Sequence, residues 1–194
     1  LLTLHHFSNP LWFERQGAFL GKNAVEQFLA MVEFAVRQLG DLVDEYVTVN
    51  EPNVYAVCGY LGAGFPPGEF SMLHALRVMK VLGECHRRAY RLIHRIHKEL
   101  GYAEPKVGLA MHMRAFVPYN AKNLWHRIAC RISEYNFQTK LNKTYMLGRD
   151  CRYADFLGLN YYARTATSGL GDGTLPHVPV NDLGWEIYPA GIVE

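Results

Sequence analysis

Hydrophobic and polar positions along the chain follow two spacings, one typical of strands and one typical of helices. Short runs rich in apolar residues predict strands over residues 1–7, 44–51, 106–113 and 154–164. Apolar residues that recur every three or four positions predict helices over residues 23–40, 71–101 and 121–141. Strands that alternate with helices are typical of a parallel sheet with crossover helices. The sequence therefore predicts an α/β fold with four parallel strands.

The predicted helices carry signals at their ends and on their faces. Asn23 and Ser71 can cap the first two helices, and Gly40 and Gly101 can end them. The apolar stripes are Ala89, Tyr90, Ile93 and Ile96 in the second helix, expected to face the sheet, and Leu124, Ile128, Ile132 and Tyr135 in the third. Basic and histidine side chains of the second helix predict a solvated outer face rather than a phosphate site. These side chains are His86, Arg87, Arg88, Arg91, His94, Arg95, His97 and Lys98.

The composition is that of an ordinary globular protein, with 49% hydrophobic and 20% charged residues in a chain of 194. A net charge of +2 gives no case for nucleic acid as a partner. No apolar run approaches the roughly 18 residues of a membrane span, so no membrane partner is expected. The cysteines form no C-x-x-C pair and no secretion signal accompanies them, which favours reduced thiols in a cytoplasmic protein. They are Cys58, Cys85, Cys130 and Cys151.

Three of the four predicted strands end in residues that can bind or react with a polar ligand. These ends are His5-His6, Asn50-Glu51 and Asn160-Tyr161-Tyr162. Because the carboxyl ends of parallel strands meet at one face of a barrel, we expect the three ends to converge. At such an end a carboxyl group can protonate a leaving group while a neighbouring amide holds a substrate hydroxyl. Asn50 and Glu51 are therefore the strongest candidates for chemistry, and a loop-capping role for Glu51 is the alternative.

Metal and nucleotide chemistry is disfavoured. His5 and His6 are adjacent on a strand and would point to opposite faces, and no H-E-x-x-H or Cys/His cluster accompanies them. The sequence contains no G-x-S-x-G, no P-loop and no G-x-G-x-x-G. We therefore expect no metal and no cofactor.

Four segments resemble motifs of the family 1 glycoside hydrolases, the β-glucosidase family. The segments are Thr3-Leu4-His5-His6-Phe7 with Pro10, Thr48-Val49-Asn50-Glu51-Pro52, Leu159-Asn160-Tyr161-Tyr162, and Gly184-Trp185-Glu186-Ile187-Tyr188-Pro189. Their order and spacing fit across the whole chain. The resemblance implies a (β/α)8 TIM barrel, present as a partial barrel with strands three to six, so that residues 1–194 form one partial catalytic domain. Both ends of the sequence are expected to continue into something longer.

The same resemblance implies a role for each matching residue in a retaining glycosidase that releases a terminal β-linked sugar. Glu51 matches the general acid/base, and Asn50 matches the residue that binds the sugar 2-hydroxyl. His6 matches a histidine that contacts the sugar. Tyr162 matches a tyrosine that hydrogen-bonds the nucleophile, with Asn160 in the same shell. The expected ligand is a small-molecule β-glycoside or oligosaccharide, and the remainder of the barrel is the expected protein partner.

The sequence also departs from the family pattern. Phe7 and Asn53 stand where tryptophan is frequent, and no T-E-N-G box, which carries the family's nucleophile, occurs in the chain. Retaining hydrolysis needs two carboxyl groups, so the chain alone is expected to be inactive. Two alternatives stay open: a non-catalytic carbohydrate-binding fragment or pseudoenzyme, and a 6-phospho-β-glycosidase.

Overall fold

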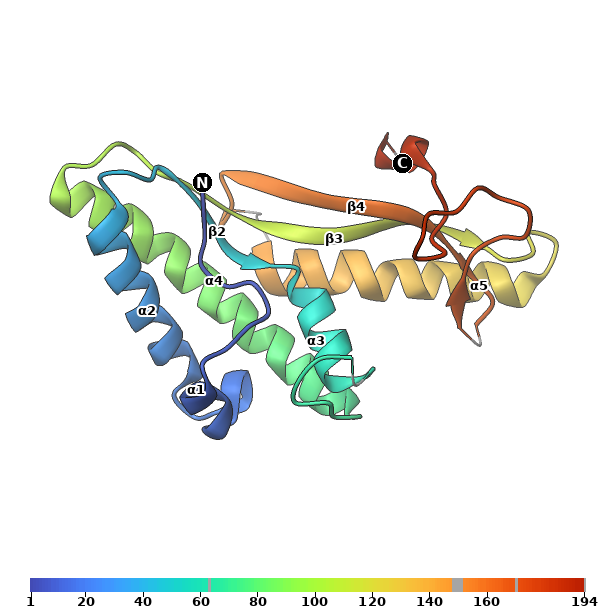
Figure 1. Cartoon of the computed structure of the whole chain (residues 1–194), viewed down its shortest axis with the longest axis horizontal. Helices are drawn as coiled ribbons and strands as arrows, with labels where there is room; N and C mark the ends of the chain where they lie inside the picture. The colour runs from blue at the N-terminus through green and yellow to red at the C-terminus, as the bar shows by residue number, and fades with distance from the viewer. Residues whose placement is uncertain (63, 148–151, 170, 194) are drawn as a thin grey trace. The chain divides into compact units, whose positions relative to one another are not determined.

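The strands of the molecule form one sheet in which neighbours in the sequence are neighbours in space (Figure 1). In chain order they are β1 (Leu2–Thr3), β2 (Glu45–Asn50), β3 (Lys106–Pro118), β4 (Phe156–Thr167) and β5 (Asp172–Gly173). β1, β2 and β3 are parallel, whereas β5 runs antiparallel to β4. The computed structural model describes residues 1–62, 64–147, 152–169 and 171–193, and within this part of the chain the sheet is open, with β1 and β5 as its edges.

The backbone divides into two compact units, and β3 and β4 each contribute to both. Unit 1 consists of Leu1–Met111 and Leu141–Gly158, and unit 2 of His112–Lys140 and Leu159–Glu194. The helices of unit 1 are α1 (Leu11–Arg15), η1 (Ala18–Leu20), α2 (Ala24–Leu39), α3 (Pro52–Tyr60) and α4 (Met72–Leu100). Unit 2 holds α5 (Leu124–Glu134) and the short η3 (Pro189–Val193), and η2 (Tyr135–Leu147) begins in unit 2 and ends in unit 1.

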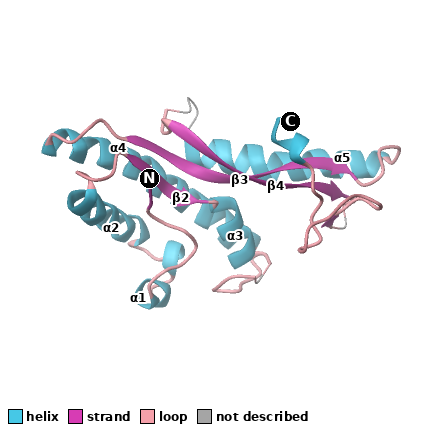
Figure 2. Cartoon of the chain, turned by 45° about the horizontal axis from the view of Figure 1, so that its top comes forward, coloured by secondary structure: helices cyan, strands magenta, loops and turns pink. Residues whose placement is uncertain are grey.

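In unit 1, the long helix α4 packs against α2, α3 and β2, and Figure 2 shows α2 beside α4. Ser71 Oγ accepts a hydrogen bond from the His74 backbone N–H, and Gly101 ends the helix with φ of 71°, as the sequence predicts. The prediction for α2 is correct in extent and at Gly40, which ends the helix, and wrong only in the cap bond expected of Asn23. Asn23 makes no side-chain cap bond, and Gly40 keeps a right-handed conformation.

The predicted outer face of α4 is wrong at two of its eight residues. His86 and His97 are fully buried, whereas Arg91, Arg95 and Lys98 are exposed. His86 Nδ1 lies 2.6 Å from Thr48 Oγ1, and His97 Nε2 lies 2.8 Å from Tyr46 Oη. Both side chains therefore reach from the helix to β2, where a hydrogen bond satisfies one nitrogen of each ring that the sequence pattern assigns to water.

In unit 2, the apolar stripe of α5 faces solvent. Leu124 is 66% exposed, and Ile128, Ile132 and Tyr135 are also exposed, whereas Ala129 and Cys130 are buried. Asn123 caps the helix, because its Oδ1 accepts from the Trp125 backbone N–H at 2.9 Å. Small side chains rather than the large apolar ones therefore form the packed face of this helix.

Strand lengths also differ from the prediction. The first strand is short and its Leu1 is exposed, rather than being a buried strand over residues 1–7. β3 and β4 run to Pro118 and Thr167, beyond the predicted ends. Neither α3 nor β5 was predicted. Cys151 lies outside the described residues, and within them Cys58, Cys85 and Cys130 are not part of a disulfide.

Candidate active site

Glu51 occupies the junction between β2 and α3. Asn50 is the last residue of β2, and Pro52 opens α3, where its fixed φ suits the first helical turn. Between them Glu51 adopts a left-handed backbone, with φ of 45° and ψ of 60°. A non-glycine residue in this region costs about 1–3 kcal/mol, and such strain clusters at functional sites.

The pairing of β2 with β3 is irregular just before Glu51. Val47 lies opposite Gly108, whereas Asn50 lies opposite Ala110, so β2 carries one more residue than β3 over this stretch. Bulges of this kind re-aim side chains and are frequent beside active sites. The Glu51 N–H still donates to the Ala110 carbonyl at 2.8 Å, which holds the end of the strand in place.

Asn50 and Glu51 are both buried, with Glu51 only 5% exposed. A carboxyl group that is removed from water needs partners in the protein, and Glu51 makes interactions with its surroundings. The neighbouring Asn53 is also fully buried, at the start of α3. The acid and its neighbouring amide are therefore held in a packed environment at the carboxyl end of a parallel strand, as the sequence predicts.

The segment that follows β1 lies beside this strand end. The Asn50 N–H donates to the His5 carbonyl at 2.9 Å, which joins the two segments through their backbones. His5 is buried and His6 is exposed, so the two side chains point in different directions as predicted, although β1 ends at Thr3 before them. Burial lowers the pKa of His5 to about 4, while its hydrogen bond with Asn9 partly opposes that shift. His5 is therefore neutral at neutral pH. The other three residues, His6, Asn50 and Glu51, all lie in unit 1.

Asn160 and Tyr162 lie in unit 2, and the structure places them inside β4 rather than at its end. The prediction that this strand stops near Tyr162 is wrong, because β4 continues to Thr167 and pairs there with β5. Tyr162 is 48% exposed, and its ring lies 4.9 Å from that of His112 and 5.8 Å from that of Trp185. The convergence of all three strand ends stays a prediction.

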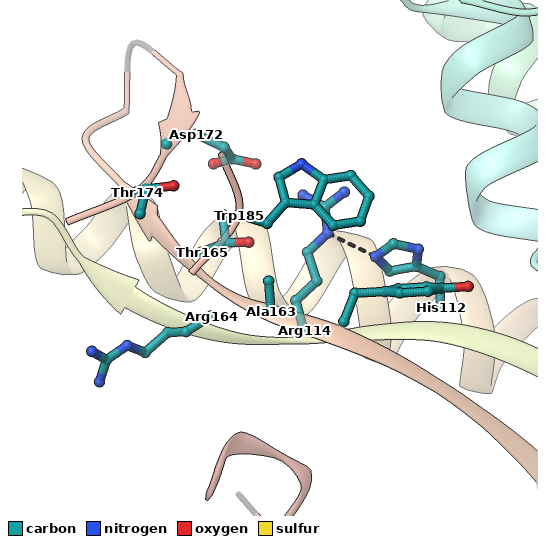
Figure 3. A pocket seen from close by; sticks show the side chains of 10 residues that line it. His112, Arg114, Ala163, Arg164, Thr165, Asp172, Thr174 and Trp185 are labelled. Carbon is teal, nitrogen blue, oxygen red and sulfur yellow. Dashed lines mark hydrogen bonds between the residues drawn. The ribbon is translucent and has the colours of Figure 1, made fainter. Parts of the chain in front are cut away.

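Tyr162 belongs to a pocket of about 190 Å³ within unit 2 (Figure 3). The pocket is lined by His112, Arg114, Tyr162, Ala163, Arg164, Thr165, Asp172, Gly173, Thr174 and Trp185. Two aromatic rings beside charged and hydroxyl side chains offer both an apolar surface and hydrogen-bonding groups. Such a combination suits a small ligand that has both apolar and polar faces.

Two arginines of this pocket are fixed in different ways. The Arg114 guanidinium donates from Nε to His112 Nε2 at 2.9 Å and stacks 5.0 Å from the centre of the Phe137 ring. Arg164 makes two bonds to the buried Glu186, of 3.0 and 2.6 Å. Figure 3 shows Arg114 extending toward Trp185 and Arg164 extending away from both. Arg114 therefore lies beside Trp185 in the pocket, whereas Arg164 points away from it and is paired with Glu186.

Sequence reasoning did not identify His112, Arg114 and Arg164 as pocket residues. A signal was present, because His112 and Arg114 alternate along the extension of a strand that seemed to end at Met113.

Among the described residues, no group of three or more His, Cys, Asp or Glu side chains could hold a metal ion. A search of the helices in the described ranges finds none long and apolar enough to cross a membrane.

The chain matches known proteins over most of its length. The model of glycosyl hydrolase family 1 matches residues 1–154. A β-galactosidase of Saccharolobus solfataricus is 29% identical over the whole chain, which covers 46% of that protein. The galactolipid galactosyltransferase SFR2 of Arabidopsis thaliana is 26% identical over 99% of the chain and 31% of its own length. The β-glycosidase from Pyrococcus horikoshii superposes with a TM-score of 0.83 and 28% identity, over 97% of this chain and 47% of that one.

These proteins extend well beyond the matched region, because the chain spans about half their length or less. The likeness in structure confirms the predicted fold, which is an α/β barrel present in part. The match over residues 1–154 confirms the predicted family. This chain belongs to glycosyl hydrolase family 1.

Proposed function

We propose that the chain is part of a retaining β-glycosidase in which Glu51 is the general acid/base. The observation that carries the proposal is the setting of Glu51, buried, at the end of β2, in a strained left-handed backbone. Membership of the family supports the same role. A residue that only capped a loop would gain nothing from burial of its carboxyl group, which costs free energy.

The proposed mechanism uses two carboxyl groups about 5–5.5 Å apart across the glycosidic bond. One attacks the anomeric carbon, while Glu51 donates a proton to the departing oxygen. Glu51 then takes a proton from water, which attacks the covalent intermediate with net retention of configuration. The nucleophile would come from outside these 194 residues, because the sequence has no T-E-N-G box.

Four further residues complete the proposed site. Asn50 would bind the sugar 2-hydroxyl, and His6 another sugar hydroxyl. Tyr162 would hydrogen-bond the nucleophile, with Asn160 beside it. The exposed His6 and the half-exposed Tyr162 are accessible to a ligand within their own units, which supports these roles.

The test is Glu51→Gln in the full-length gene product, with Glu45→Gln at the opposite end of β2 as a matched control. Loss of the acid should lower kcat/KM for cellobiose by about 10²–10⁴, because a sugar leaving group needs a proton. Dinitrophenyl glucoside, whose leaving group needs none, should keep its kcat/KM. Undiminished hydrolysis of cellobiose by Glu51→Gln would remove Glu51 from the role.

Glu51→Ala offers a second measurement. In this variant the covalent intermediate formed from the dinitrophenyl substrate lacks a base to activate water, so added azide should attack instead and restore turnover. The product should be the β-glycosyl azide, which NMR identifies by its anomeric coupling. An α-configured azide, or no response to azide, would contradict a retaining mechanism with Glu51 as the base.

β-Linked glucose is our proposed glycone, and the cytoplasm our proposed location. Among the described residues Cys58, Cys85 and Cys130 form no disulfide, which is in keeping with a reducing compartment. The relative named β-galactosidase makes galactose the competing sugar. Rates on nitrophenyl β-glucoside and β-galactoside separate the two sugars, and cell fractionation tests the location.

A further inference from the structure

A hydrogen-bond network in unit 1 surrounds Asn9, which lies between β1 and α1. Asn9 Nδ2 donates to Glu14 Oε1 at 2.6 Å and to Tyr55 Oη at 2.8 Å. Asn9 Oδ1 lies 3.1 Å from His5 Nε2. One short side chain thus joins three other side chains, which come from the loop, from α1 and from α3.

The direction of each bond in this network is fixed by chemistry. The Glu14 carboxylate can only accept, so the Asn9 group that faces it must be the donating NH2. The Asn9 oxygen then faces His5 and can only accept, so His5 must carry its proton on Nε2. A rotated amide would set an oxygen against the carboxylate. Asn9 therefore has one satisfactory orientation, and so does the His5 ring.

The bond to Tyr55 connects Asn9 to Glu51 through the first turn of α3. The Tyr55 N–H donates to the Glu51 carbonyl at 3.0 Å, and the Tyr55 side chain is fully buried. Glu51 is the turning point between β2 and α3, so the placement of α3 sets the direction in which its carboxyl group leaves the backbone. Anchoring α3 at Tyr55 therefore fixes the Glu51 side chain at its root.

The bond to His5 connects Asn9 to the other segment of the site. The His5 ring also meets the Phe19 and Tyr55 rings edge to face, with centroids 5.1 and 5.4 Å apart. The His5 carbonyl accepts from the Asn50 N–H, and His6 follows directly in the chain. Both segments that carry the proposed site residues of unit 1 are thus bonded to the same amide.

We propose that Asn9 is a positioning residue. It orients the general acid Glu51 by tying α3 to the loop between β1 and α1. Asn9 need not touch substrate in this role. The inference rests on the proposed function of Glu51. A purely structural role would lower stability and leave the relative rates on different substrates unchanged.

The experiment compares Asn9→Ala and Tyr55→Phe in the full-length gene product. Tyr55→Phe keeps the buried ring and removes the hydroxyl, which accepts from Asn9 and also hydrogen-bonds Tyr60, so it reports on the link even if Asn9→Ala fails to fold. Tyr60→Phe removes the other partner of that hydroxyl and should leave the ratio unchanged. Asn23→Ala is the matched control, because Asn23 begins α2 without a side-chain cap bond. The readout is kcat/KM for cellobiose divided by kcat/KM for dinitrophenyl glucoside.

Misplacement of the acid should lower this ratio about tenfold in Tyr55→Phe and in any folded Asn9→Ala, and leave it unchanged in Asn23→Ala. An unchanged ratio in Tyr55→Phe, or an equal fall in Asn23→Ala, would overturn the proposal. Glu51→Gln is measured in parallel. If the ratio collapses in Glu51→Gln and not in Tyr55→Phe, only the role of Asn9 fails. If Glu51→Gln leaves the ratio unchanged, the proposed function fails and the role of Asn9 fails with it.

Discussion

At the scale of the residue, Glu51 combines two features that oppose stability. It is buried, and its φ of 45° lies in the region that favours glycine. Residues selected for folding alone would avoid both features. Their coincidence at the end of β2 is best explained by a requirement for the direction of the carboxyl group.

The backbone strain can be measured by comparing Glu51→Gly with Glu51→Ala. Both variants remove the carboxyl group, and only glycine accepts the left-handed conformation without strain. The free energy of unfolding of Glu51→Gly should therefore be about 1 kcal/mol larger than that of Glu51→Ala. The order should reverse at Lys80, an exposed position in the interior of α4, where glycine costs about 1 kcal/mol relative to alanine. Urea unfolding provides both comparisons, and equal stability of the two Glu51 variants would argue against strain.

At the scale of the element, β3 and β4 approach each other closely because of Gly108. A Cβ atom added at Gly108 would lie 2.3 Å from the Phe156 carbonyl oxygen. Thr48 Oγ1 also donates to the Gly108 carbonyl at 3.3 Å, so the same residue meets β2 on its other side. Gly108 therefore permits the central pairing of unit 1.

Gly108→Ala should destabilise the protein by about 1–3 kcal/mol, because backbone atoms must shift to admit the methyl group. Gly171→Ala is the control, since an added Cβ there has open space and a backbone without positive φ. Thermal unfolding of both variants tests the expectation. A Gly108→Ala variant as stable as wild type would show that the two strands have room to separate.

At the scale of the whole molecule, buried neutral histidines make stability depend on pH. Burial lowers the pKa of both His5 and His86 from 6.5 to about 4. Between pH 6.5 and 4 the unfolded chain binds protons at these positions and the folded chain does not. The contribution of each neutral histidine to the free energy of unfolding should therefore be fully present above pH 6.5. It should be lost as the pH falls toward 4, by up to about 3 kcal/mol for each histidine.

His86→Gln tests this expectation, because glutamine can keep a hydrogen bond to Thr48 and has no proton to gain. Urea unfolding at several pH values between 7 and 4 gives the slope of the free energy of unfolding against pH. In His86→Gln this slope should be smaller than in wild type by about one bound proton. Leu73→Gln introduces the same side chain at an exposed position of the same helix without removing a titratable group, and should leave the slope unchanged. An identical slope in His86→Gln would assign the pH dependence to other groups.

Much of the fold could be predicted from the sequence. The order of the four predicted strands and three predicted helices, the extent of α2 and α4, and the family are confirmed. Errors lie where polarity misleads: His86 and His97 stand among arginines in the sequence but lie on the buried face of α4 with Ile93, and β4 continues through polar residues past Tyr162. Local polarity indicates solvent, but a buried hydrogen-bond partner such as Thr48 can outweigh it.

By itself the sequence determined which chemical groups stand at the end of β2 and in which order the predicted strands and helices follow, because spacing and side-chain chemistry are local properties. Only the tertiary structure decided the left-handed turn at Glu51, the burial of two helix histidines and the joining of Asn9 to Tyr55, 46 residues away. Each of these depends on contacts between distant segments. No local pattern encodes such a contact, since the free energy of burial is set by whichever partner the fold brings close.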